Sequence, residues 1–194
     1  MIVAVSIFII TTLIVVGGLV SLSDAARKAR ATRTVTDNLG AAIESISRNM
    51  RIGSTFHCGC GTSGTPSTPG DSTFPTGSRN CPMTGNSGGG GDVCIAYEPP
   101  GGDPSSALDQ VVYRLSSGRI QRSKDGGTTY LDITAPELNV STFRFYVGGT
   151  TVNDHQPFMT MIIRAVAGER VESRTEFNIQ TTISSRSPNF DLTP

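Results

Sequence analysis

The chain of 194 residues contains no tryptophan, and aromatic residues make up only 6% of it. Surfaces that stack on sugars or nucleic-acid bases are built from aromatic side chains, so this composition argues against both kinds of binding. Charged residues are also few, at 16%, and their charges sum to zero. Nucleic-acid binding usually needs a dense basic face, which is lacking here. We therefore predict no nucleic-acid partner.

Signatures of catalysis are missing as well. The sequence contains no G-x-S-x-G, H-E-x-x-H, P-loop or G-x-G-x-x-G pattern. Its two histidines are His57 and His155. His57 adjoins Cys58, but neighbouring residues rarely face each other, which disfavours a Cys/His nucleophile pair. The sequence therefore predicts neither an enzyme nor a bound cofactor.

Charge is absent altogether from residues 1–23, and the first ionisable side chain is Asp24. A helix of this length spans ~30 Å, the thickness of a bilayer's hydrocarbon core, and satisfies its own backbone groups in lipid. A cleaved signal peptide is disfavoured, because the segment lacks a basic start and its apolar run is too long. We predict a transmembrane or filament-core helix, whose candidate contact residues are Ile2, Val5, Phe8, Ile9, Leu13, Val16 and Leu19.

Two glycines, Gly17 and Gly18, interrupt this apolar segment. Glycine weakens a helix by ~1 kcal/mol, so this is where the helix could bend or melt. The alternative is that these small residues allow another helix to approach closely.

Residues 24–53 continue the helix without a proline until Gly53, a natural helix stop. Their apolar side chains recur at steps of three and four, which places them on one helix face. A stripe of this kind packs on the protein's own core, and we expect a sheet beneath it. The stripe consists of Val35, Leu39, Ala42, Ile43, Ile46 and Met50.

Residues 54–108 are rich in Gly, Ser and Thr and contain all four cysteines. We interpret them as a variable loop region with one short strand, Val93–Tyr97. An even cysteine number suits disulfides in an oxidising compartment, and a Cys58–Cys60 pair is disfavoured because so small a ring is strained. Cys58 and Cys60 are then each expected to reach one of Cys81 and Cys94. A metal site is the alternative, although the C-x-C spacing departs from that of zinc sites.

Residues 109–186 read as an antiparallel β meander. Strands are predicted over 110–115, 119–123, 130–133, 140–147, 158–167 and 173–184, with a hairpin turn at Ser116–Gly118. One half-buried sheet suits an amphipathic helix as its cover. The predicted class is α+β, with the long N-terminal helix packed on one antiparallel sheet. Residues 187–194 are expected to form a polar tail.

The chain begins Met1-Ile-Val-Ala-Val-Ser-Ile-Phe8, and its predicted central hairpin carries Val112–Leu115 and Gly118–Ile120. This start resembles the apolar run that follows Gly and Phe-Thr-Leu-Ile-Glu in prepilins of the type IV pilin and type II secretion pseudopilin superfamily. The hairpin looks like that of the minor, J/W-like members. The resemblance covers most of the chain in layout, but in residues only the first ~20 and the hairpin.

The leader, the cleavage glycine and the glutamate of this superfamily are not found before Met1, so the resemblance implies either a start codon assigned too late or a truncated form. No residue in this numbering takes a role in processing, prepilin N-terminal methylation or subunit register. Arg27, Lys28, Arg30 and Arg33 would place the head in the cytoplasm by the positive-inside rule. The resemblance and the disulfides require the head outside, and we expect a basic leader upstream to settle the orientation.

The resemblance implies a structural subunit, a minor pilin or pseudopilin of a type IV pilus, type II secretion or DNA-uptake filament. Its partners would be other pilin or pseudopilin subunits, membrane lipid and an inner-membrane assembly platform. It would cross the cytoplasmic membrane once, with an extracytoplasmic head, and reach a filament or the cell surface after assembly. The alternative is a membrane-anchored extracytoplasmic binding module that does not polymerise.

Two further motifs have alternative interpretations. Some pseudopilins bind calcium in a loop, and Asp92, Asp103, Asp109 and Asp125 could contribute to such a site. The EF-hand spacing is missing, which favours aspartates that form turns. The triplet Asn139-Val140-Ser141 matches a glycosylation acceptor but falls at the start of a predicted strand.

Overall fold

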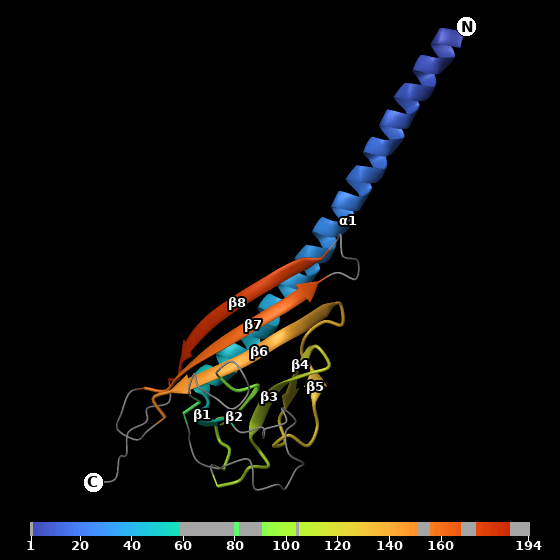
Figure 1. Cartoon of the computed structure of the whole chain (residues 1–194). Helices are drawn as coiled ribbons and strands as arrows, with labels where there is room; N and C mark the ends of the chain where they lie inside the picture. The colour runs from blue at the N-terminus through green and yellow to red at the C-terminus, as the bar shows by residue number, and fades with distance from the viewer. Residues whose placement is uncertain are drawn as a thin grey trace.

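A long helix and a two-sheet head make up the computed structural model of this chain (Figure 1). The structure describes residues 2–58, 80–81, 91–103, 105–150, 156–167 and 174–186. Within these ranges, helix α1 spans Ile2–Ile52 and is followed by eight strands. The strands are β1 (Ser54–His57), β2 (Cys94–Glu98), β3 (Val111–Ser116), β4 (Arg119–Ser123), β5 (Leu131–Asp132), β6 (Leu138–Gly148), β7 (Phe158–Ala167) and β8 (Thr175–Ser184).

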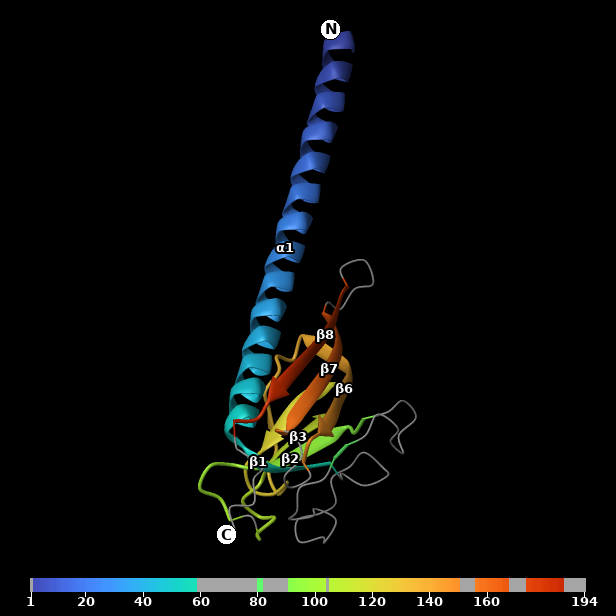
Figure 2. The same ribbon diagram turned by 90° about the vertical axis from the view of Figure 1, so that its left-hand side faces the viewer.

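Helix α1 divides into two halves that differ in their surroundings. Its second half packs along the head, whereas its first half projects away from it (Figures 1 and 2). The predicted stripe forms the contact: Val35, Leu39, Ala42, Ile46 and Met50 are at most 5% exposed. Ile43 is partly buried against the same cluster. The steps of three and four residues thus place one apolar face against the head.

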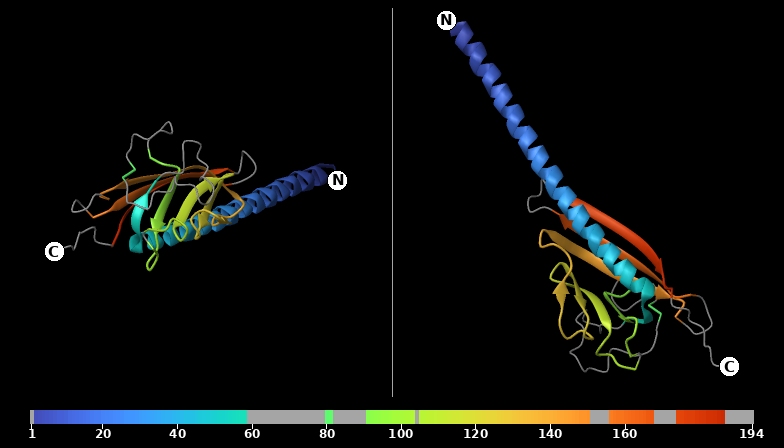
Figure 3. Two further views of the ribbon diagram at one scale, coloured as in Figure 1. Left: turned by 90° about the horizontal axis from the view of Figure 1, so that it is seen from below. Right: turned by 180° about the vertical axis from the view of Figure 1, so that it is seen from behind.

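The helix covers an antiparallel sheet in the order β6-β7-β8, which it crosses diagonally in the right-hand view of Figure 3. Buried and more exposed positions alternate along β6 and β7, as expected for strands with one covered face. Two hydrogen bonds join the end of β8 to the end of α1. The amide of Arg186 donates to the carbonyl of Arg51 at 2.7 Å, and the hydroxyl of Ser185 donates to that of Gly53 at 3.1 Å.

A second antiparallel sheet has the order β1-β2-β3-β4-β5. Its β3–β4 hairpin turns through Ser117 and Gly118, with φ values of 49° and 73°. Positive φ at both central residues gives a turn whose twist matches that of the strands. Tyr97 stacks between Phe56 and Tyr113, with ring centroids 5.9 and 6.2 Å away. These rings belong to one apolar cluster that α1 and both sheets share.

The α+β class with a long N-terminal helix is confirmed, and the predicted 119–123 and 158–167 strands have their predicted bounds. Two features differ from the sequence-based predictions. Strand β1 lies in a segment predicted to be irregular, and the strands form two hydrogen-bonded sheets instead of one. The reason is that β6 does not pair with β5, and the backbone at its free edge forms hydrogen bonds with other residues. Its Val147, Phe145 and Val140 pair with Cys81, Asp92 and Gly118. Most of the predicted variable region and the polar tail lie outside the described residues.

Candidate functional site: the exposed apolar half of α1

The first half of α1 presents a continuous apolar surface that touches no part of the described head. By length and composition it could cross a membrane, and no part of its most apolar window is buried. Its large apolar side chains are between 51% and 84% exposed. An isolated chain in water would not tolerate this, because a large exposed patch of this kind marks an interaction site. The exposed set is Ile2, Val3, Val5, Ile7, Phe8, Ile9, Ile10, Leu13, Ile14, Val15, Val16, Leu19, Val20 and Leu22.

The predicted contact residues Ile2, Val5, Phe8, Ile9, Leu13, Val16 and Leu19 all belong to this exposed set. They recur at steps of three and four and so lie along one broad face of the helix, while other exposed apolar residues, such as Val3, Ile7 and Ile14, occupy the remaining faces. A helix that is apolar all round is buried among other helices or in lipid. The surface therefore suits an apolar environment on every side.

The hydroxyl groups of Ser6, Thr11 and Thr12 in this half are satisfied within the helix itself. Thr12 donates to the carbonyl of Phe8 at 2.7 Å, and Ser6 donates to that of Ile2 at 3.0 Å. The hydroxyl of Thr11 lies 3.0 Å from the carbonyl of Ile7 and 2.9 Å from that of Phe8. These side chains therefore need no external hydrogen-bond partner, as an apolar environment requires.

Gly17 and Gly18 lie towards the C-terminal end of this half, and α1 continues through both as one helix. A Cβ added at either position would meet nothing within 4 Å. The two glycines thus leave a bare strip of backbone on the exposed surface, which allows close approach of a neighbouring helix. Bending or melting at this point in an assembly stays a prediction.

Charged side chains separate the exposed half of the helix from the half that packs on the head. The cations Arg27, Lys28, Arg30 and Arg33 all lie on exposed turns. Arg33 forms an ion pair with Asp37 at 3.9 Å, with both side chains more than 70% exposed. Such a pair contributes little to stability. The charges therefore mark where an apolar surrounding would end.

The described cysteines, Cys58, Cys81 and Cys94, lie on the head, at the far end of α1. Cys58 and Cys81 form a disulfide, as one of the predicted pairings has it, and Cys94 is also disulfide-bonded. Cys60 lies outside the described residues. Zinc binding and nucleophilic attack both need a cysteine thiolate, which a disulfide does not provide. The disulfides therefore disfavour the alternatives of a zinc site and of a His57–Cys58 nucleophile pair.

A buried polar cluster behind β2 and β3 was not predicted from the sequence. Nε2 of His57 lies 2.9 Å from Oε1 of Gln110, and both residues are fully buried. Glu98 is 1% exposed, and its burial, together with the negative charge of Asp109, raises the pKa of its carboxyl group. The signal in the sequence was strand alternation: because Tyr97 faces α1, the next residue, Glu98, is expected on the opposite face of the strand. His155 lies outside the described residues.

Two of the four candidate calcium ligands, Asp103 and Asp125, act in turns. Oδ1 of Asp103 accepts hydrogen bonds from the amide and hydroxyl of Ser105, at 2.9 and 2.6 Å. Oδ1 of Asp125 accepts bonds from the hydroxyl of Ser123 at 2.6 Å and the amide of Thr129 at 2.9 Å. These bonds, with one from the hydroxyl of Thr129, lower the pKa of Asp125 to about 2.

Asp92 forms a similar local bond, since its Oδ1 accepts the amide of Val93 at 2.7 Å. The turn-forming interpretation therefore accounts for Asp103 and Asp125, whereas Asp92 pairs with Phe145 in an isolated β-bridge. Asn139 of the glycosylation triplet lies within β6, with an exposed side chain.

No protein-family model, no curated protein and no solved structure matches this chain.

Proposed function

We propose that this chain is a structural subunit, a minor pilin or pseudopilin, of a type IV pilus, type II secretion or DNA-uptake filament. The observation that carries the proposal is that the fully exposed apolar half of α1 continues without a break into the half packed on the head. An arrangement of this kind presents a rigid apolar rod that other subunits can surround. The sequence resemblance of residues 1–8 to the prepilin N-terminus supports the choice of this family.

The energetics favour such a use of the helix. Transfer of one large apolar side chain out of water is favourable by about 1.5–3 kcal/mol, so burial of this surface away from water is strongly favoured. A bilayer and a bundle of identical helices both satisfy it. Before assembly, residues 2–22 would hold the protein in the cytoplasmic membrane, and afterwards they would pack in the filament core. The disulfide of Cys58 and Cys81 suits a head outside the cytoplasm.

A single charge in the apolar half tests the proposal in the cell that makes this protein. In lipid, a lysine near the helix centre costs about 2.5–3.5 kcal/mol, which the remaining apolar residues offset. In a packed filament core it has no partner. We expect Ile9→Lys or Val15→Lys to stay in the membrane fraction and to be lost from the filaments that shearing releases. Ile9→Leu, which conserves volume, is the matched control and should be incorporated normally.

Exchange of the helix separates this function from that of a membrane-anchored binding module. Residues 2–22 are replaced by an unrelated transmembrane helix of equal length. A filament subunit should remain anchored but fail to assemble, because the new helix lacks the surface that its neighbours pack against. The proposal would be refuted if the exchanged protein were fully functional and the wild-type protein were absent from sheared filaments. This result would favour the anchored module.

A further inference from the structure

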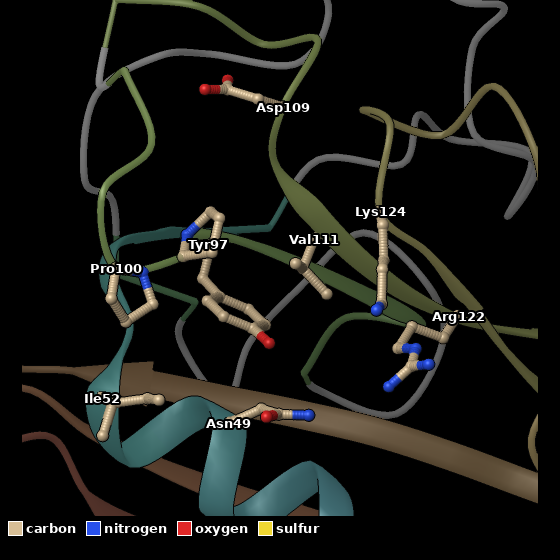
Figure 4. Close-up of a pocket in the computed structure, with 9 residues that line it drawn as sticks. Asn49, Ile52, Tyr97, Pro100, Asp109, Val111, Arg122 and Lys124 are labelled. Atoms are coloured by element: carbon tan, nitrogen blue, oxygen red, sulfur yellow. The ribbon is translucent and has the colours of Figure 1, made fainter.

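A pocket of about 300 Å³ lies where the last turn of α1 meets the ends of β2, β3 and β4 (Figure 4). It is far from the apolar half of the helix and is not used by the proposed filament function. Its size is at the lower end of the range of small-ligand sites, which is enough for a group the size of one amino-acid residue. The side chains around it divide into a cationic end, an apolar wall and an acidic end.

The cationic end is formed by Arg122 and Lys124, which extend from β4 and the residues after it towards the same space (Figure 4). Arg122 lies opposite Tyr113 in the strand register and is half-buried. Neither cation forms an ion pair within the part of the chain that the structure describes. Two neighbouring cations without an acidic partner favour an anion between them.

Neutral polar groups border this cationic end. The Asn49 amide donates to the Tyr113 hydroxyl at 3.3 Å, which holds both side chains in place. The Tyr97 hydroxyl points into the space between Asn49 and Arg122 (Figure 4). Burial and a hydrogen bond with Tyr113 raise the pKa of Tyr97, so its hydroxyl stays protonated at the border of the cationic end.

The opposite wall is apolar and stiff. Pro99 and Pro100 follow β2, and Ile52 lies on the same side of the pocket, whereas Val111 lies between Tyr97 and Lys124 (Figure 4). Proline rings hold their backbone with little freedom, so the wall is formed before a ligand arrives. An apolar body could be buried here at little entropic cost.

Asp109 lines the far end of the pocket, away from Arg122 and Lys124 (Figure 4). Its Oδ2 accepts the amide of Asp103 at 2.8 Å, and Glu98 is its acidic neighbour. Negative charge at this end repels an anion and directs it to the cationic end. The pocket therefore selects the orientation of a ligand as well as its charge.

From this arrangement we propose that the pocket binds a carboxylate carried on a small apolar body, with the carboxylate between Arg122 and Lys124 and the apolar part against Pro99 and Pro100. A guanidinium and an ammonium group are suited to hold a carboxylate through charge-assisted hydrogen bonds. The carboxylate could belong to a free small acid or to the last residue of another protein chain. Both sources present the same chemistry to this pocket.

A purely structural role for the two cations is the competing explanation. The last turn of α1 carries unpaired carbonyl groups and the negative end of the helix dipole, which nearby cations stabilise. Among the described residues, the side chains of Arg122 and Lys124 donate no hydrogen bond to these carbonyls. If the cations served the helix alone, substituting them would lower stability and leave ligand binding unchanged.

Titration of the full chain in detergent micelles, with labelled isoleucine and valine methyl groups, tests the proposal by NMR. The probes are N-acetyl-leucine, which has a carboxylate, and N-acetyl-leucinamide, which has the same body without the charge. The acid should shift the Ile52 and Val111 methyl signals and bind about tenfold or more tightly than the amide, because charged hydrogen bonds are the stronger ones. Higher salt should weaken its binding.

Substitutions give an independent readout. Arg122→Gln and Lys124→Gln should each weaken binding of the acid by about tenfold, whereas Arg164→Gln, an exposed arginine on β7, should leave it unchanged. The proposal is overturned if the acid causes no shift up to about 50 mM, or if acid and amide bind equally. It is also overturned if both Gln variants lower the melting temperature without changing binding.

A second pair of probes distinguishes the two sources of the carboxylate. A hexapeptide that ends in leucine is compared with N-acetyl-leucine. Binding of the peptide about tenfold or more tightly would identify the end of another protein chain as the source, because contacts outside the pocket would then contribute. Equal binding would identify a small free acid. Either result supports the carboxylate site itself.

Discussion

Cys58 and Cys81 join the two sheets of the head. Cys58 follows β1 of the five-stranded sheet, whereas Cys81 pairs through its backbone with Val147 of β6 in the other sheet. The amide of Cys81 donates to the carbonyl of Val147 at 2.9 Å, and the amide of Val147 donates back at 3.2 Å. The disulfide therefore connects the end of one sheet to the edge of the other, where no regular strand pairing does so.

Removal of this disulfide should destabilise the head. The bond closes a loop with a sequence separation of 23, and loops of about this length are stabilised by about 3 kcal/mol. We expect Cys58→Ala/Cys81→Ala to lower the free energy of unfolding by that amount. Denaturant titration of the full chain in micelles measures it through tyrosine fluorescence, since all four tyrosines lie between residues 97 and 146. A loss below about 1 kcal/mol would contradict the expectation.

Gly53 and Gly40 provide a matched pair of glycines for a test of packing. A Cβ at Gly53 would lie 2.4 Å from Cδ2 of Tyr97, whereas one at Gly40 would meet nothing within 4 Å. Gly53→Ala should therefore cost about 1–3 kcal/mol through overpacking. Gly40→Ala, inside the helix, should stabilise by about 0.5–1 kcal/mol. Melting temperatures in the same micelles compare the two, and equal effects would show that the helix end readily adjusts.

The two halves of α1 should respond differently to the same substitution. Ile46 is fully buried against the head, whereas Ile14 is 69% exposed in the projecting half. Ile46→Ala should lower the free energy of unfolding by about 2–5 kcal/mol, because it removes packed methyl groups and leaves a cavity. Ile14→Ala should leave unfolding of the head unchanged. Tyrosine fluorescence reports both, and a large effect of Ile14→Ala would reveal a contact between the projecting half and the head.

Asp125 should make the stability of the β4–β5 turn depend on pH. Hydrogen bonds from Ser123 and Thr129 lower the pKa of its carboxyl from 3.8 to about 2. A lowered pKa gives stability that is present above the unfolded-state value and lost as pH falls through the folded-state value. Asp125→Asn should therefore destabilise the head at pH 6, and its difference from the wild type should shrink between about pH 4 and 2.

Thr129→Ala provides the companion variant for this pH dependence. It removes the hydroxyl donor to Asp125, so it should abolish part of the effect and leave the rest to Ser123. The measurement is the melting temperature of each protein in steps of pH. A difference between the wild type and Asp125→Asn that stays constant from pH 6 to about 2 would show that these hydrogen bonds do not favour the ionised carboxyl.

Features that rest on neighbouring residues could be predicted from the sequence. The uncharged run up to Ser23 and the stripe from Val35 to Met50 predict one helix with two environments, because their periods are properties of the local chain. The turn at Ser117 and Gly118 likewise places the strands that flank it, and Arg119–Ser123 forms as predicted. For the candidate site, the absence of charge from residues 1–23 was enough to predict which part of the helix would not pack on the head.

Only the tertiary structure decided the features that depend on distant pairing. Strand β1 forms because Ser54 pairs with Glu98 and His57 pairs with Ala96 of β2. The register shifts between these two pairs, where Thr55 has a φ of 50°. The split into two sheets follows from which backbone reaches the edge of β6. The carboxylate pocket needs Asn49, Tyr97 and Arg122 from three elements at once. Residue periodicity describes one face of one element, and it carries no information about which elements meet, so these juxtapositions required the fold.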